Sequence, residues 1–174
     1  MSYRKLLLFG NSSSGKSTLA KKLASLENLA HLDLDSLAWL RTQPPTRQCV
    51  EVSTSQIIDF IETHNGWVIE GCYTDLLRVA EPSSTEIVYL NIPVEECVTN
   101  ARMRAWEPHK YESKEAQDKN LDMLIDWIKQ YPTKNGTISE QAHTDFYNKY
   151  TGKKTKIQDL ETALEVNASD PKLG

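Results

Sequence analysis

Short apolar runs alternate along the chain with longer segments in which apolar side chains recur every three or four residues. Strands are predicted at residues 4–9, 67–71 and 86–92, which are apolar, at residues 30–35, where apolar and acidic side chains alternate, and within residues 154–160, where a short last strand is expected. The segments between them have the spacing of amphipathic helices. Strands that alternate with helices are typical of βαβ units, in which helices cover both faces of a parallel sheet. The pattern therefore predicts an α/β fold with about five parallel strands.

Polar residues and prolines mark where the predicted helices begin. Pro93 and Ser139 each precede a periodic apolar stripe, and each predicts a helix start. Ser53 with Gln56 three residues later resembles a capping box, so a helix is predicted to begin there. Residues 121–131 have a strong apolar stripe and predict a further helix.

The chain has 174 residues, a length that suits one domain with one core. We expect this domain to cover residues 1–166 and to be followed by a polar tail at 167–174. Residues 106–137 begin with a charged stretch that contains a proline and continue into a helical pattern. This segment is predicted to form a lid or cover, and most of its charged side chains are interpreted as a solvated face.

Composition narrows the class of protein. The net charge is −4 and the pI about 5.6, so no basic face is indicated and nucleic acid is an unlikely partner. Apolar runs of membrane-spanning length and a signal peptide are both absent from the sequence. Three widely spaced cysteines fit neither a disulfide framework nor a zinc site. We expect a cytoplasmic monomer or homodimer with reduced thiols.

The most specific motif is GNSSSGKST at residues 10–18, which matches G-x-x-x-x-G-K-[S/T]. Its two glycines permit the turns that direct successive backbone N–H groups inward. Lys16 can reach the β- and γ-phosphates of a nucleotide, and Ser17 can ligate Mg²⁺. A strand is predicted before the loop and a helix from Ser17 after it, which is the context that the motif requires.

The sequence therefore predicts a nucleotide site whose donor is ATP with Mg²⁺. GTP is less favoured, because no guanine-reading N-K-x-D string is present. The loop residues expected to contact the nucleotide are Gly10, Asn11, Ser12, Ser13, Ser14, Gly15, Lys16, Ser17 and Thr18.

Acidic residues lie at the ends of two predicted strands. Asp33 and Asp35 are two apart, so in an extended chain their carboxylates share one face and repel unless a cation or donor lies between them. We expect Asp33 to bind magnesium or the acceptor, and Asp35 to orient or deprotonate an acceptor hydroxyl. Glu70 can hold the water shell of magnesium. The alternatives are a helix cap at one aspartate and an exposed acid at Glu70.

Arg102 and Arg104 are candidates for a phosphate clamp. Residues two apart on a helix cannot share a face, so only one of them can point to the phosphates. We expect this to be Arg104, because a planar guanidinium can bridge the oxygens of a transferring phosphoryl group. The alternative is that both arginines are solvated.

Several larger side chains follow the second and third predicted strands and are candidates for an acceptor pocket. They include Trp39, Tyr73 and Arg78. Trp39 also suits a place in the core.

Four stretches together resemble a known family. GNSSSGKST, HLDLDSLAW, GWVIEG and IVYLNIP, the last followed by Arg102 and Arg104, resemble the adenylate kinase and shikimate kinase group of small P-loop phosphotransferases. The similarity is greatest to adenylate kinase-related members that are also described as DNA topology modulation proteins. It covers residues 4–106.

This resemblance implies a three-layer α/β/α fold with a five-stranded parallel sheet in the order 2-3-1-4-5 and a mobile helical lid. Asp33 and Asp35 resemble the paired acids of shikimate kinases, which serve magnesium and the acceptor hydroxyl. Glu70 and Gly71 resemble the Asp-Gly of adenylate kinases, which implies a place for Gly71 at the acceptor. Arg104 falls where these kinases carry a lid arginine.

The sequence also departs from this group. GCYTD follows the third predicted strand, where shikimate kinases carry a glycine-rich triplet, and the Pro-Arg pair of adenylate kinases is missing. Asn100 stands where another arginine would stack on the base. Neither shikimate nor a nucleoside monophosphate is therefore supported as the acceptor.

These sequence features are compatible with three functions. The favoured one is a Mg-ATP-dependent kinase acting on a small molecule, with Lys16, Asp35 and Arg104 as its catalytic residues. The alternative is an ATP-binding regulatory protein with weak or no ATPase activity and a role related to nucleic acid. An ATPase or GTPase switch is the least favoured.

Overall fold

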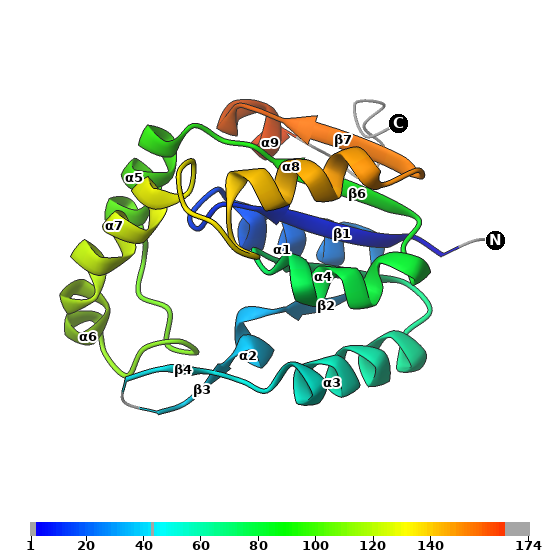
Figure 1. Cartoon of the computed structure of the whole chain (residues 1–174), viewed down its shortest axis with the longest axis horizontal. Helices are drawn as coiled ribbons and strands as arrows, with labels where there is room; N and C mark the ends of the chain where they lie inside the picture. Colours follow the sequence, from blue (N-terminus) through cyan, green and yellow to red (C-terminus); the bar gives the residue numbers. More distant parts are fainter. Residues whose placement is uncertain (1–2, 43, 166–174) are drawn as a thin grey trace.

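The computed structural model describes residues 3–42 and 44–165, and a five-stranded sheet forms its centre (Figure 1). Its strands are β1 (Lys5–Gly10), β2 (Ala30–Asp33), β5 (Trp67–Gly71), β6 (Glu86–Leu90) and β7 (Lys153–Ile157). The order is β2-β5-β1-β6-β7, and every neighbouring pair is parallel. Because β1 is central, the loop that follows it opens at the middle of the carboxyl edge.

Counted along the chain among themselves, these strands stand in the expected order 2-3-1-4-5. An antiparallel hairpin of β3 (Trp39–Leu40) and β4 (Thr46–Arg47) lies outside the sheet. The apolar pattern does not indicate this hairpin, because strands of two residues are too short to show alternation.

Helices connect the strands and cover the sheet. Their bounds are α1 (Lys16–Glu27), α2 (Asp35–Ala38), α3 (Val50–Thr63), α4 (Thr74–Ala80), a 3₁₀ turn at Glu81–Ser83, α5 (Val94–Met103), α6 (Lys114–Lys119), α7 (Leu121–Gln130), α8 (Glu140–Lys149) and α9 (Leu160–Glu165). Pro93 and Ser139 occupy the N-cap positions of α5 and α8, which confirms both predicted starts.

Alternate side chains of β1 enter two separate cores, as the pleat of a strand requires. Leu7 and Phe9 pack with buried residues of α3, α4 and α8. Leu6 and Leu8 pack with buried residues of α1, α5, α7 and α9. These two cores, one on each face of the sheet, confirm the predicted three-layer α/β/α architecture.

The helix start predicted at Ser53 is wrong. α3 begins at Val50 with Cys49 as its N-cap, and Ser53 lies inside the helix. The Ser53 side chain is buried, and its Oγ donates a hydrogen bond to the carbonyl of Leu37 at 2.8 Å. The serine therefore links α3 to α2 rather than capping its own helix.

The segment predicted as a lid, residues 106–137, contains α6 and α7 and lies at one side of the sheet (Figure 1). Ile125 and Ile128 of α7 are buried, and Ile128 belongs to the core that Leu6 and Leu8 form with α1, α5 and α9. The tail predicted at 167–174 lies outside the described residues. Within the described part of the chain, every helix is too short or too polar to cross a membrane.

Candidate functional site

The loop from residue 10 to residue 18 makes a sharp turn between β1 and α1. A Cβ on Gly10 would lie only 2.3 Å from the carbonyl oxygen of Leu90, so β6 leaves no room for a side chain. Ser13 and Gly15 adopt positive φ angles of 59° and 91°. Left-handed residues within such a loop turn successive N–H groups toward a common centre, where an anion binds.

Side chains of the neighbouring helices fix this loop. Asn11 is buried, and its Nδ2 donates to the carbonyl of Ile128 at the end of α7 at 3.2 Å. Its Oδ1 accepts a hydrogen bond from the backbone N of Ser12 at 2.8 Å. On the other side, Nδ2 of Asn100 in α5 donates to the carbonyl of Ser13 at 3.0 Å. The loop is therefore supported by both α5 and α7.

The polar side chains of the loop are prepared for a ligand. Lys16 is largely buried, and its Nζ donates to the carbonyl of Asn11 at 2.7 Å. Among the described residues, the buried hydroxyls of Ser13 and Ser14 have no hydrogen-bond partner. Buried hydroxyls are normally paired, so both are available to phosphate oxygens. Ser17 is half-buried in the first turn of α1, and Thr18 is exposed.

The three predicted acids meet beside this loop, but not as the sequence predicts. β2 ends at Asp33, and Asp35 begins α2, so the two carboxylates do not share one extended face. Asp33 Oδ1 accepts a hydrogen bond from the backbone N of Asp35 at 2.9 Å. Asp33 is paired in register with the buried Glu70 of β5. Burial, followed by the charges of Glu70 and Asp35, raises the pKa of Asp33.

Lys110 is a site residue that the sequence does not reveal. Its Nζ lies 2.8 Å from Asp35 Oδ2, 3.5 Å from Asp33 Oδ2 and 3.7 Å from Glu107 Oε1. Burial lowers the pKa of Lys110, but the charges of Asp35 and Asp33 outweigh burial and raise it. Most charged side chains of the segment are exposed, as predicted, but Glu107 and Lys110 are exceptions, because this part of the chain folds back over the acids.

Asp35 is further held by aromatic residues. Tyr73 donates from its hydroxyl to Asp35 Oδ1 at 2.6 Å, and Trp39 Nε1 donates to that hydroxyl at 2.7 Å. Burial raises the pKa of Asp35, but the charge and hydrogen bond of Lys110, together with the Tyr73 hydroxyl and the charge of Lys16, outweigh burial, and the pKa is lowered. The carboxylate therefore stays ionised, and it lies close enough to the phosphate-loop lysine to respond to its charge.

Other predicted acceptor residues lie differently. Gly71 ends β5, and a Cβ there would be 2.8 Å from the side chain of Leu34, so the glycine provides packing space. Arg78 is exposed on α4, with its guanidinium 5.6 Å from the Phe146 ring of α8. Its contact with Phe146 does not connect Arg78 to the side chains around Asp35.

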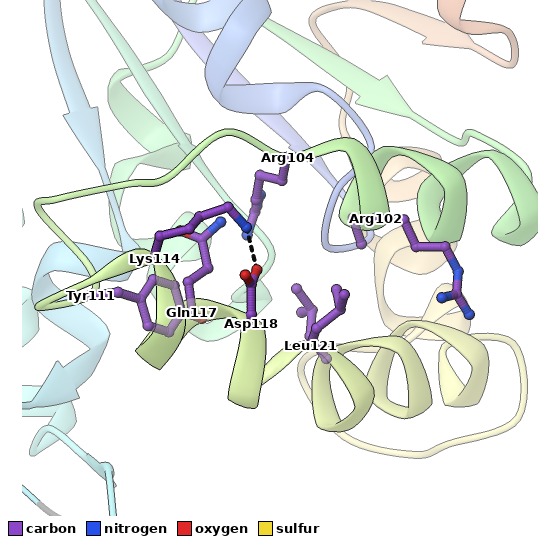
Figure 2. A pocket seen from close by; sticks show the side chains of 9 residues that line it. Arg102, Arg104, Tyr111, Lys114, Gln117, Asp118 and Leu121 are labelled. Carbon is purple, nitrogen blue, oxygen red and sulfur yellow. Dashed lines mark hydrogen bonds and ion pairs between the residues drawn. The ribbon is translucent and has the colours of Figure 1, made fainter.

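Arg104 and Arg102 line a surface pocket between the end of α5 and the α6–α7 segment (Figure 2). Arg104 points toward Lys114 and Gln117, whereas Arg102 points away from them. The two arginines do not lie on one helix as predicted, because α5 ends at Met103 and Arg104 follows it in an extended conformation. Arg104 Nη1 also lies 3.1 Å from Glu107 Oε2, which gives it a connection through Glu107 to Lys110. The guanidinium is thus already paired with a carboxylate.

The arrangement of the acidic side chains indicates what kind of metal site they could form. Among the described residues, no group of three or more His, Cys, Asp and Glu side chains is arranged to hold a metal ion. Magnesium bound with a nucleotide takes most of its ligands from phosphate and water, so one hydroxyl and one or two carboxylates are sufficient. Ser17, Asp33 and Glu70 fit that smaller requirement by residue type.

A buried polar chain behind the site also escapes sequence analysis. His143 Nε2 lies 2.8 Å from the carbonyl of Cys72 and must donate to it, so Nδ1 accepts from Tyr131, whose hydroxyl is 2.6 Å away. The hydroxyl of Tyr131 in turn accepts from Tyr89 at 2.9 Å. Histidine and tyrosine separated by many residues give no sequence signal for such a chain.

Comparisons with known proteins support the fold. No family model and no curated protein sequence matches the chain. A gluconokinase from Sinorhizobium meliloti 1021 is structurally similar, with a TM-score of 0.54, 10% identity and coverage of 95% of this chain and 87% of that chain. A sugar kinase from Janibacter sp. HTCC2649 has a TM-score of 0.51 and 12% identity, with 94% and 91% covered.

A shikimate kinase from Bacteroides thetaiotaomicron has 17% identity and a TM-score of 0.45, with 83% of this chain and 97% of that chain covered. At these identities the comparisons concern the fold alone. The gluconokinase and the sugar kinase, together with the phosphate loop and the strand order, show that the chain has the fold of the small P-loop kinases.

Proposed function

We propose that this protein is a Mg-ATP-dependent phosphotransferase that acts on a hydroxyl group of a small molecule. The observation that carries the proposal is the position of Asp35. Its ionised carboxylate lies within electrostatic reach of Lys16 and is held by the Tyr73 hydroxyl at 2.6 Å. A carboxylate fixed beside a phosphate loop is suited to orient an attacking hydroxyl.

Different residues would bind the donor phosphates, hold magnesium and orient the acceptor. The loop N–H groups and Lys16 bind the donor phosphates, and Ser17 with Asp33 or Glu70 would hold magnesium, which neutralises charge on the phosphates. Asp35 acts mainly by orienting the acceptor, because a lowered pKa makes it a weak base. A loose phosphoryl-transfer transition state requires positioning and charge stabilisation more than proton abstraction.

Lys110 occupies the side of Asp35 that an acceptor would need. Since its Nζ lies 2.8 Å from Asp35 Oδ2, the segment that carries it must move before an acceptor hydroxyl can take that place. Movement of the part of the predicted lid that precedes α7 would provide this access, because α7 itself is packed in the core and bonded to the phosphate loop.

The test is a screen for phosphoryl transfer from labelled Mg-ATP to pools of hydroxyl-bearing small molecules. With an acceptor found in this way, Asp35→Asn should lower the rate at least about 100-fold, because a neutral amide accepts a weaker hydrogen bond from the hydroxyl than a carboxylate does, and its NH₂ group can face the hydroxyl instead. The control is Asp59→Asn, which changes an exposed acid on α3 and should keep the wild-type rate. Full activity of Asp35→Asn would contradict the role given to this carboxylate.

The second candidate is an ATP-binding regulatory protein with little or no ATPase activity. It is favoured by the internal pairing of both Asp35 and Arg104, with Lys110 and Glu107 respectively. In that case Mg-ATP would bind, but no pool would raise ADP formation above background.

A further inference from the structure

Lys134 lies in the connection between α7 and α8, which crosses the site next to the phosphate loop. Its backbone N donates to the carbonyl of Gln130 at 2.8 Å, which extends α7 by a turn. Farther along, the backbone N of Thr74 donates to the carbonyl of Thr137 at 3.1 Å and ties the connection to α4. In Figure 1 the connection passes beside the β1–α1 loop, consistent with the Asn11–Ile128 hydrogen bond.

The ammonium group of Lys134 is buried and incompletely paired. Among the described residues its Nζ has neither a hydrogen-bond partner nor an ion pair. The contact recorded for it is the face of Trp127, whose ring centroid is 3.5 Å away. An aromatic face attracts a cation but leaves most of its three N–H donors without acceptors. A buried cation in this condition is unfavourable unless an anion joins it.

The groups that face Lys134 supply no such anion. Hydrogen bonds tie the two ends of the connection to the phosphate loop and to α4, through Asn11 with Ile128 and Thr74 with Thr137. In agreement with this placement, the charges of Lys134 and Lys16 both act on Cys72 and on His143. Burial raises the pKa of the Cys72 thiol to about 11 and lowers the pKa of His143 to about 3. Burial also raises the pKa of Tyr131, so all three groups are neutral near pH 7. The buried hydroxyls of the loop serines lack partners as well.

We propose that Lys134 is a second phosphate-binding residue, which together with Lys16 holds a phosphoryl group at the end of the phosphate loop. This inference rests on the proposed function and adds to it a residue from the returning segment of the lid. The phosphate is either the terminal group of the donor or that of a phosphorylated product. Arg104, the cation that the sequence favours for this role, is paired with Glu107 instead.

Calorimetric titration of the full chain with Mg-ATP and with Mg-ADP tests the inference. Lys134→Met should weaken Mg-ATP binding about 10- to 100-fold, the value of a charge-assisted hydrogen bond. Binding of Mg-ADP, which lacks the third phosphate, should be unchanged. Lys134→Arg should restore part of the loss, and Lys129→Met, which removes an exposed cation of α7, should behave as wild type.

A second arm distinguishes the two sources of phosphate. Inorganic phosphate is titrated into the protein saturated with Mg-ADP. If Lys134 serves a phosphorylated product instead, Lys134→Met weakens this phosphate binding while Mg-ATP and Mg-ADP bind as before. Methionine removes an unpaired buried charge, so the variant should melt at the wild-type temperature or above it.

Proton uptake gives a readout on the wild-type protein itself. Burial lowers the pKa of Lys134 to about 8, so at pH 8.5 the free side chain is largely neutral and must gain a proton when a phosphate binds. The last phosphate proton is lost near pH 6 and does not contribute. Titration in buffers of different ionisation enthalpy should show uptake at pH 8.5, little at pH 6.5, and none in Lys134→Met.

The failure of this inference can be told apart from failure of the proposed function. If the wild-type protein binds neither nucleotide, the proposed function itself is wrong. If the wild type binds both, and Lys134→Met matches Lys129→Met for ATP, for phosphate and for proton uptake, Lys134 holds no phosphate.

Discussion

His143 is fully buried in α8, with both ring nitrogens engaged by Tyr131 and the carbonyl of Cys72. Burial lowers its pKa to about 3, so the folded protein keeps the ring neutral over most of the acid range. An unfolded chain protonates the same ring near pH 6.5. Because burial gives His143 a lower pKa in the folded than in the unfolded protein, the free energy of unfolding depends on pH.

The sign of that dependence follows from proton binding. Below pH 6.5 the unfolded state binds a proton that the folded state excludes, so stability must fall as the pH falls toward 3. This residue should account for a loss of about 2 kcal/mol between pH 6.5 and 5.0. Urea unfolding at several pH values measures it. The dependence of the unfolding free energy on pH should become weaker in His143→Gln. It should stay unchanged in His109→Gln, which changes an exposed histidine and serves as the control. Equal slopes in wild type and His143→Gln would refute the assignment.

Single residues show why part of the site is readable from sequence and part is not. Lys16 and Ser17 belong to a local motif whose backbone context is fixed by adjacent residues. Asp35 is found by sequence as a site acid, but its orientation depends on Tyr73, which lies 38 positions away. Lys110 and Lys134 are lysines in polar segments, and only tertiary packing distinguishes them from solvated ones.

At the scale of elements, the segment from Glu107 to Lys119 differs from a solvated surface segment. Lys110 has only 18% of its side chain exposed and contacts Asp33 and Asp35. By contrast, Lys114 pairs with Asp118 one turn further along α6, with both side chains about half exposed. The pairs of Lys110 attach the segment to the edge of the sheet, whereas the Lys114–Asp118 pair joins two residues of one helix.

Removal of the two lysines should therefore have different effects. Lys110→Met leaves Asp33 and Asp35 without their cation and should destabilise the protein by about 2 kcal/mol, because breaking a partly buried ion pair leaves its carboxylates uncompensated. Lys114→Met should cost less than about 1 kcal/mol. Chemical unfolding of both variants gives the comparison. Equal destabilisation would show that the 107–119 segment does not rest on the acids in solution.

The elements themselves follow from sequence to different degrees. The five sheet strands are predicted within a few residues. β1, β5 and β6 have buried apolar runs bounded by turn residues, whereas the edge strands β2 and β7 are partly exposed and have weaker patterns. α2 has only four residues, too few for a period, and so the break between Asp33 and Asp35 is missed. Ser53 is misassigned because the pattern of a cap does not reveal that its hydroxyl is used by Leu37.

At the scale of the whole molecule, the sheet order brings the loop after β1, the end of β2 and the end of β5 to one edge. That juxtaposition makes a phosphate site and an acidic site into neighbours, although they lie far apart in the chain. The fold is that of small P-loop kinases, and the assignment to phosphoryl transfer depends on the phosphate loop holding Mg-nucleotide.

Thermal unfolding with and without Mg-ATP tests most directly whether the phosphate loop holds a nucleotide, because a ligand that binds only the folded state raises the melting temperature. The wild-type protein should gain several degrees at millimolar Mg-ATP, and Lys16→Met should lose most of this gain. Lys21→Met, an exposed lysine of the same helix, should retain it. If neither ATP nor GTP with Mg²⁺ raises the melting temperature of the wild type, the loop does not hold a nucleotide and the account is wrong.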